Sequence, residues 1–220
     1  MAVDLNRLIA PEPPNLPVGT EQYERRYMDQ FGNVLRLYFN RLTNALQALF
    51  GTAGGKLLSF PYGAFKSTVS QTATANTATL LTLNTTDYAS EVSLVSPSKI
   101  KVENSGMYNL QFSVQVENYD NAPQDIYIWL KKGNGATITD IVGSTGVIGL
   151  PARKNVSDPA HTIAGWNYFV SMTKDDFIQI YWSTTHASMS IPAYAASGTP
   201  TKPSTASVVA TLTFVSEIPS

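Results

Sequence analysis

Few residues of this chain could do acid–base or metal chemistry. The sequence contains two histidines, His161 and His186, and no cysteine. Either imidazole could serve as a base or a metal ligand, but neither lies in a spaced cluster with carboxylates. Asp175 and Asp176 are adjacent, and neighbouring strand positions point to opposite faces, so the two form a poor catalytic pair. The sequence therefore predicts no metal site and no cofactor.

The other motifs with catalytic potential are also incomplete. Gly133-Asn134-Gly135 and residues 143–146 lack the lysine and the following helix of a phosphate loop. No serine lies in the Gly-x-Ser-x-Gly context of a nucleophile elbow. Glycoside hydrolysis needs a pair of carboxylates, and the 16 acidic residues are scattered along the chain. We expect a protein that is not an enzyme.

The composition of the chain limits the kinds of partner that it is expected to bind. Only 14% of the 220 residues are charged, against about 25% in typical soluble domains, and Lys and Arg do not cluster, which argues against a nucleic-acid partner. No apolar run approaches the roughly 18 residues of a membrane span, and residues 1–20 lack the pattern of a signal peptide. The absence of cysteine weakly favours assembly in a reducing cytoplasm. A surface with so few charges suits subunits that bury much of themselves against one another.

Residues 1–20 are predicted to form an extended arm, because proline fixes φ and removes a hydrogen-bond donor. The prolines of the arm are Pro11, Pro13, Pro14 and Pro17. The apolar residues at its tip, which we predict to be attachment residues, are Val3, Leu5, Leu8 and Ile9. The arm is either a disordered terminus or an anchor that docks onto a larger partner.

Residues 21–50 have the period of an amphipathic helix, with Thr20 as a candidate N-cap and Gly51 as a candidate terminator. Apolar residues recur at steps of three and four, which places them on one face at about 100° per residue. The predicted helix-interface residues are Tyr23, Tyr27, Phe31, Val34, Tyr38, Leu42 and Leu49. This face must be buried on the head domain or against copies of itself, and the spacing favours a short bundle over a regular coiled coil.

Beyond a glycine joint at residues 51–56, residues 57–220 read as a separate head in which the period changes to two. Apolar side chains occupy every second position at Tyr108, Leu110, Phe112, Val114 and Val116. Further predicted strands cover residues 69–83, 99–102, 126–130, 138–148, 166–172, 177–182 and 208–215. Many short strands separated by regular turns predict a mainly β protein, a β-sandwich.

Two of these strands, residues 125–130 and 177–182, are apolar on both faces. In a two-sheet sandwich the outer face of a strand should be polar. An apolar outer face is therefore covered by a loop, by the helix, or by another subunit, because aromatic residues are enriched at subunit interfaces. The predicted residues of a head trimer interface are Tyr127, Trp129 and Tyr181.

The region from about residue 58 to residue 216 resembles the C1q/TNF-like jelly roll. The resemblance lies in residues 105–112, in residues 126–132 with the glycine turn that follows, in residues 169–180 and in residues 209–214. Two departures are Asp175, where the family usually has glycine, and additional residues between Gly133 and Ile141. Members of the family form compact trimers, so the resemblance implies a homotrimer.

A jelly-roll head behind a helix and a proline-rich arm also resembles fibre, knob and capsid-decoration proteins of tailed bacteriophages. This implies a virion structural protein that is assembled in the host cytoplasm and held to other virion proteins by its N-terminal arm. Tyr119 and Tyr194 are candidates for contact with a host-surface glycan, with ordinary loop packing as the alternative. The competing hypothesis is a free-standing C1q/TNF-like ligand or carbohydrate-binding module, which the missing cysteines and signal peptide disfavour.

Overall fold

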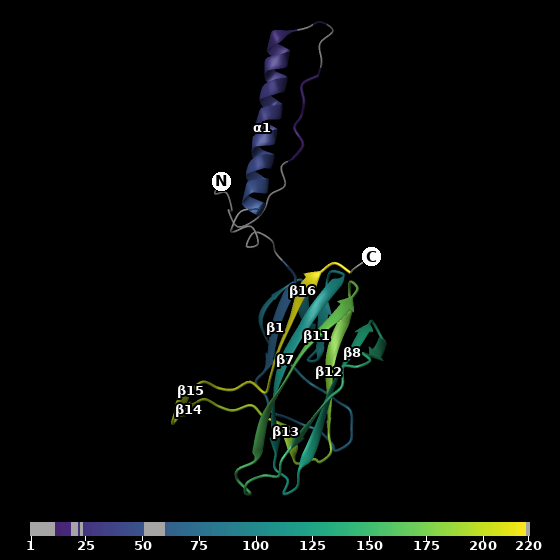
Figure 1. Cartoon of the computed structure of the whole chain (residues 1–220), viewed down its shortest axis with the longest axis vertical. Helices are drawn as coiled ribbons and strands as arrows, with labels where there is room; N and C mark the ends of the chain where they lie inside the picture. The colour runs from purple at the N-terminus through teal and green to yellow at the C-terminus, as the bar shows by residue number, and fades with distance from the viewer. Residues whose placement is uncertain (1–11, 19–21, 23, 51–59, 219–220) are drawn as a thin grey trace. The chain divides into compact units, whose positions relative to one another are not determined.

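The computed structural model describes residues 12–18, 22, 24–50 and 60–218. The chain divides into two compact units, one before residue 60 and one from Phe60 onward (Figure 1). The predicted attachment residues Val3, Leu5, Leu8 and Ile9 lie outside the described residues, as do Tyr23 and the glycine joint.

The first unit contains one helix, α1 (Arg25–Phe50). The sequence pattern placed its start at residue 21, and the structure begins it at Arg25. The Tyr27 hydroxyl donates a hydrogen bond to the carbonyl oxygen of Pro17 over 3.3 Å. Residues 12–18 therefore run back alongside α1 (Figure 1). The rings of Tyr27 and Phe31 stack, with centroids 6.2 Å apart.

The second unit, the head, is a sandwich of two antiparallel sheets and a small hairpin. The strands of sheet A are β1 (Tyr62–Ser67), β2 (Gln71–Thr72), β4 (Thr85–Ser90), β7 (Gly106–Asn118), β11 (Ala160–Met172), β13 (Met189–Ile191) and β16 (Val208–Ser216). The strands of sheet B are β3 (Thr79–Leu80), β5 (Val92–Val95), β6 (Lys99–Val102), β8 (Gln124–Asn134), β9 (Thr137–Asp140), β10 (Gly146–Leu150) and β12 (Phe177–Thr184). The hairpin consists of β14 (Ser197–Gly198) and β15 (Thr201–Lys202).

The order of the strands explains how distant segments meet. Sheet A follows the order β2-β13-β7-β16-β1-β4, with β11 on the other side of β7. Sheet B follows β10-β8-β12-β6-β5, with β9 paired to β8 and β3 paired to β12. The longest ladder joins β11 to β7, from Ala160 opposite Asn118 to Met172 opposite Gly106.

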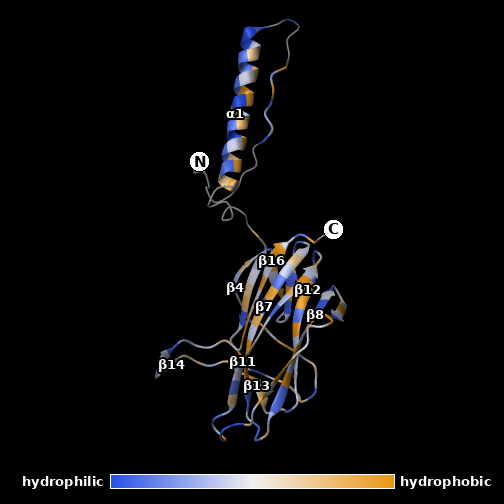
Figure 2. Ribbon diagram, viewed as in Figure 1, coloured by the Kyte–Doolittle hydropathy of each residue, from blue (hydrophilic) through white to orange (hydrophobic). Residues whose placement is uncertain are grey.

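The core lies between the two sheets, and the alternation of the sequence predicted much of it. The five apolar residues of β7 from Tyr108 to Val116 are all buried, as are Ile126, Ile128 and Leu130 of β8. Figure 2 shows hydrophobic residues along β7, β12 and β16. The threonine-rich stretch 69–83 is different, since it forms only β2 and β3. Between them the chain turns at Asn76, whose φ is 56°.

The buried side chain of Tyr108 makes the stability of the head depend on pH at high pH. Its side chain is fully buried, and its hydroxyl donates to the carbonyl oxygen of Asn104 over 2.8 Å. Burial, and secondly the charge of Glu91, raise the pKa of Tyr108 to about 12. The pKa of tyrosine in the unfolded chain is about 10. The folded head therefore keeps its full stability below pH 10, where Tyr108 is neutral in both states. It loses stability as the pH rises from 10 towards 12, because only the unfolded chain then ionises readily.

We therefore expect the free energy of unfolding to fall between pH 10 and pH 12, with Tyr108 contributing up to about 3 kcal/mol of the loss. In a Tyr108→Phe variant this part of the pH dependence should disappear, because no hydroxyl remains to ionise. Denaturant titrations of both proteins across this range measure the effect. Equal slopes for the two proteins would contradict the assignment.

Candidate interaction surface

The outward face of sheet A is nearly free of charge where β7, β11 and β16 form it, while Lys66 of β1 and Asp87 of β4 make an exposed ion pair of 2.6 Å at the other side of the sheet. Because side chains alternate across a strand, the odd-numbered residues of β7, β11 and β16 point away from the core. They lie side by side, as Phe169 and Thr213 show by pairing with Asn109 from either side. In these three strands, which the structure describes completely, Glu117 is the only Asp, Glu, Lys or Arg. The rest of the face is made of apolar residues and of Ser, Thr, Asn and Gln, with His161 beside Glu117.

Large apolar side chains are exposed on this same face. Ile163 is 64% exposed, Phe169 56% and Val209 44%. Ile163 pairs with Gln115 and Val209 with Ser113, so they flank β7 from opposite sides. The side-chain oxygen of Asn109 is buried and finds no hydrogen-bond partner among the described residues. Interfaces are depleted of charge at their centre, and the part of the face formed by β7, β11 and β16 has that character.

The outward face of sheet B contrasts with it. Lys101 pairs with Asp175 at 2.7 Å, and Lys131 pairs with Asp140 at 3.3 Å. Lys99 adds a cation that lies 4.3 Å from the centroid of the Phe177 ring. Charges of both signs in exposed pairs are typical of a solvated surface, where each pair adds little stability.

The predicted head-interface residues Tyr127, Trp129 and Tyr181 lie on the outward face of sheet B. The rings of Trp129 and Tyr181 stack with centroids 5.8 Å apart, and the Lys131 ammonium lies 4.7 Å from the Tyr181 ring centroid. Tyr127 and Trp129 line an open hollow of about 580 Å³ together with residues 140–143. The structure thus brings the three aromatic residues together, and their part in a trimer stays a prediction.

The buried carboxylate of Glu117 lies at one end of the outward face of sheet A. Glu117 is only 3% exposed and accepts hydrogen bonds from the hydroxyls of Tyr194 and Ser190. The Nδ1 atom of His161 lies 3.4 Å from the same carboxylate and 3.2 Å from the Tyr194 oxygen. Burial first, and then the interaction with Glu117, raise the pKa of Tyr119 and of Tyr194.

Tyr119 and Tyr194, the two residues predicted to contact a receptor, therefore lie around one carboxylate. The sequence pattern does not assign Glu117 to this cluster, because it is 77 residues from Tyr194 and belongs to a strand whose apolar alternation dominates the pattern. The one signal in the sequence is a single acidic residue on the polar side of an otherwise uncharged strand. Contact of Tyr119 and Tyr194 with a glycan stays a prediction.

The β14–β15 hairpin starts from this cluster and projects away from the head (Figure 1). Its base is held by two backbone hydrogen bonds between Tyr194 and Thr205, of 3.0 and 2.9 Å. A hollow of about 560 Å³ lies between Tyr194 and Lys202 on one side and Gln115, His161 and Ile163 on the other. The hollow therefore borders the part of the outward face formed by β7 and β11.

We expect a Tyr194→Phe variant to loosen this hairpin. The change removes a hydrogen bond to a buried carboxylate, which should cost about 1–2 kcal/mol for a partly exposed hydroxyl. Amide hydrogen exchange at residues 194–205 should become faster, while that of β7 stays slow. Tyr88→Phe is the matched control, because Tyr88 is 71% exposed at the edge of sheet A. Unchanged exchange in the Tyr194→Phe protein would show that Glu117 does not hold the hairpin.

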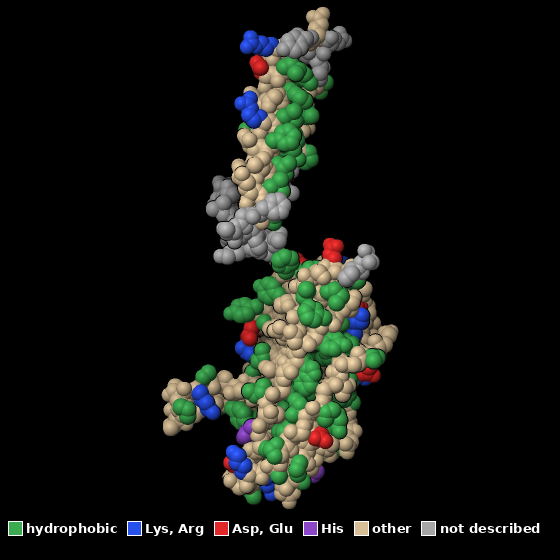
Figure 3. Space-filling model, in the orientation of Figure 1, with side chains coloured by type: hydrophobic (Ala, Val, Ile, Leu, Met, Phe, Trp, Pro, Cys, Tyr) green, Lys and Arg blue, Asp and Glu red, His purple; other side chains and the backbone are tan. Residues whose placement is uncertain are grey.

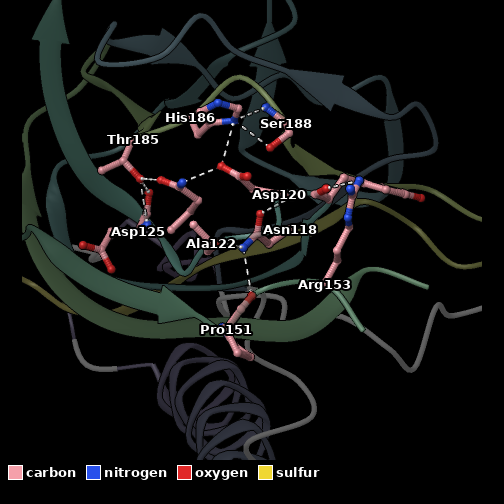
Figure 4. Close-up of polar contacts among 11 residues, drawn as sticks. Asn118, Asp120, Ala122, Asp125, Pro151, Arg153, Thr185, His186 and Ser188 are labelled. Carbon is pink, nitrogen blue, oxygen red and sulfur yellow. Dashed lines mark hydrogen bonds and ion pairs between the residues drawn. The ribbon is translucent and has the colours of Figure 1, made fainter. Parts of the chain in front are cut away.

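A second polar cluster organises the loops next to the buried carboxylate (Figure 4). Asn118 is fully buried and donates to the carbonyl oxygens of Ala122 and Pro151 over 3.0 and 2.8 Å. Its own side-chain oxygen accepts the backbone N–H of Asp120 over 2.8 Å. Burial opposes ionisation of Asp120, but hydrogen bonds from Gln124 and the backbone outweigh it and lower the pKa of that carboxyl.

Two findings bear on other classes of site. Among the described residues, no three His, Cys, Asp or Glu side chains form a group that could hold a metal ion. In the same part of the chain, no helix combines the length and the apolar character needed to cross a bilayer.

Comparison with known proteins identifies the fold. No family model and no curated protein matches the sequence. The solved structure of Eiger TNF from S. frugiperda aligns with a TM-score of 0.51 and 7% identity, over 74% of this chain and 97% of that one. Murine APRIL aligns with a TM-score of 0.45 and 6% identity, over 71% of this chain and 100% of its own. The predicted fold class is confirmed: a TNF-like jelly-roll sandwich preceded by one helix.

Proposed function

We propose that this chain is a non-enzymatic structural protein that forms a homotrimer through the outward face of sheet A. We propose further that residues 1–50 attach the trimer to a bacteriophage virion, as a short fibre, knob or decoration protein with the head outward. The observation that supports this best is the difference between the two outward faces. The part of sheet A formed by β7, β11 and β16 has Glu117 as its only Asp, Glu, Lys or Arg and is partly apolar, whereas the outward face of sheet B carries paired charges.

The sheet A face is suited to contact with copies of itself. Burial of a fully exposed Ile, Phe or Val side chain is worth about 1.5–3 kcal/mol, and Ile163, Phe169 and Val209, which are 44–64% exposed in a single chain, would each contribute part of that. Residues close to a three-fold axis meet their own copies, so a region with few charges avoids repulsion between like charges there. The Ser, Thr, Asn and Gln side chains around the apolar residues can hydrogen-bond across the contact.

The N-terminal unit supports attachment. The exposed fractions of Met28, Phe39 and Leu46 are 45%, 56% and 41%, so α1 keeps apolar surface available in a single chain. Three arms from one trimer would bind a particle with high avidity even if each arm bound weakly. Val3, Leu5, Leu8 and Ile9 are the residues we propose for this contact.

A binding role for the head is a second candidate, as in a free-standing ligand or carbohydrate-binding module. The hollow between Tyr194 and Ile163 favours it, because such concave sites beside aromatic residues accept small ligands. Glycan-array binding by the wild-type protein, lost in a Tyr194→Ala variant, would support this role.

The attachment is tested by deleting residues 1–20, or by replacing Leu5, Leu8 and Ile9 with serine. We expect the protein to stay trimeric in light scattering and to be absent from purified particles viewed by cryo-electron microscopy. Val142→Ser is the control, since Val142 is 94% exposed on the head and should not affect incorporation. Normal occupancy of the arm variants on particles would place the anchor in the head.

A further inference from the structure

The β14–β15 hairpin receives little support from its own chain. Residues 195–204 are exposed, apart from the half-buried Ser197. Within the described part of the chain, the hydrogen bonds of these residues join them only to one another. Figure 1 and Figure 3 show the hairpin standing clear of both sheets apart from its base. Because a two-stranded hairpin alone is only marginally stable in water, a second surface is needed to hold it.

The hairpin leaves the head beside the part of sheet A formed by β7, β11 and β16. The hollow of about 560 Å³ at its base is lined by Lys202 of the hairpin and by Gln115 and Ile163 of β7 and β11. A partner head seated on these strands must therefore meet the hairpin as well. At about 3.3 Å per residue, the stretch from Ala195 to Thr199 reaches roughly 16 Å, close to the radius of gyration of about 15 Å expected for a head of this size. The hairpin is long enough to lie across a neighbouring head.

The composition of the hairpin favours a copy of this chain over a foreign receptor as its partner. Residues 195–204 contain no aromatic residue and no Arg, and Lys202 is their only charged residue. Contacts that carry most of a binding energy are enriched in Trp, Tyr and Arg, and the hairpin has none of them. Its Ala, Ser, Thr, Gly and Pro side chains are small, so its backbone can lie close to a surface along its whole length. Such a segment suits an extension of an interface that other residues already form.

We propose that the β14–β15 hairpin of each subunit lies against the neighbouring head of the same trimer. The number of copies rests on the proposed homotrimer. Around a three-fold axis each head gives one hairpin and receives one, so the contact is heterologous and the ring closes. The hairpin's partner is thus a second copy of this chain. Loss of the hairpin should weaken the trimer without unfolding the head, because residues 195–204 bury little within their own chain.

Replacing residues 195–204 with Asn-Gly removes the hairpin and keeps its base. Tyr194 and Thr205 exchange two backbone hydrogen bonds, of 3.0 and 2.9 Å, which is the pair that a two-residue turn requires, and Asn-Gly is a preferred sequence for such a turn. We expect the circular dichroism of the head and the slow amide exchange of β7 to stay unchanged. In sedimentation velocity, the protein concentration at which trimers dissociate should rise about tenfold or more. An unchanged dissociation would overturn the inference.

Photo-crosslinking tests the contact directly in the full-length protein, which has no cysteine of its own. Ala196→Cys can carry a benzophenone label on the hairpin. Irradiation should then give covalently linked dimers and trimers on a denaturing gel, because the label lies against a neighbouring chain. Val142→Cys is the matched control, since Val142 is 94% exposed and lines the hollow on sheet B, away from the proposed contact. Its label should give few linked chains.

Light scattering of the same samples separates the possible outcomes. A trimer in which the label at residue 196 links no second chain would overturn the hairpin contact and leave the homotrimer standing. A monomer in light scattering would overturn the proposed homotrimer, and the hairpin contact with it. If the Asn-Gly variant keeps the trimer affinity of the wild type but no longer binds host cells, the hairpin contacts a receptor and the inference is wrong.

Discussion

Replacing both Ile163 and Phe169 with aspartate is expected to convert the proposed homotrimer into monomers. Both side chains are exposed in a single chain, so circular dichroism and the thermal melt of the monomer should change little. In a trimer the same positions would bury six carboxylates, and each unpaired buried charge costs several kcal/mol. Sedimentation velocity at micromolar concentration measures the change as a loss of about two thirds of the particle mass, the ratio that symmetry dictates.

Val147→Asp is the matched control. Val147 is 56% exposed and pairs with Tyr127 on the outward face of sheet B, where we expect a new charge to be tolerated. If Val147→Asp dissociates the trimer and the double aspartate variant does not, the interface lies around Tyr127, Trp129 and Tyr181, as the sequence predicted. The two variants therefore decide between the faces.

Asn118→Ala is expected to destabilise the head by about 2–4 kcal/mol, since it removes three hydrogen bonds from a buried site at about 0.5–1.5 kcal/mol each. The carbonyl oxygens of Ala122 and Pro151 would lose their partner in a place that water does not easily reach. Chemical denaturation measures the loss, and exchange of the amides in residues 119–124 should become faster.

His186→Ala is the control, because it tests whether the loss of any polar side chain in these loops destabilises the head as much as Asn118→Ala does. The His186 side chain is 52% exposed and lies 3.3 Å from Asp120 in the same cluster (Figure 4). Exposed ion pairs contribute at most about 1 kcal/mol, so this variant should keep nearly all the stability of the wild type. Equal losses in the two variants would mean that Asn118 does not hold the loops together.

The sequence predicted the strands that are apolar on one side only. In β7 the alternation from Tyr108 to Val116 predicts a strand with five apolar side chains on its buried side, and all five are buried in the structure. The resemblance places Asp175 where the family usually has glycine, and that residue adopts a φ of 71°. Hydrophobic periodicity is a local property of the sequence, so it predicts a strand even when the neighbouring strands in the sheet are unknown.

The candidate surface could not be found in the same way. The candidate surface is marked by the scarcity of charge on β7, β11 and β16, which are spread over residues 106–216. The apolar pattern of the sequence predicts a different interface at Tyr127, Trp129 and Tyr181, whose rings are partly covered within their own chain, and that interface stays a prediction. Which polar positions share a face becomes visible only when the register of β7, β11 and β16 is known.

The position of β16 sets the timing of folding during synthesis. β16 lies between β1 and β7 in sheet A. Ser67 of β1 therefore cannot pair until its partner Val208, 141 positions later, has been synthesised. At about 5–20 residues per second, translation of that interval takes on the order of 10 s. Until then β1 and β7 lack the strand that joins them, and their free edges can pair with other chains. Yield of the head should therefore depend on chaperones that shield nascent chains, and slower translation across this interval should increase aggregation.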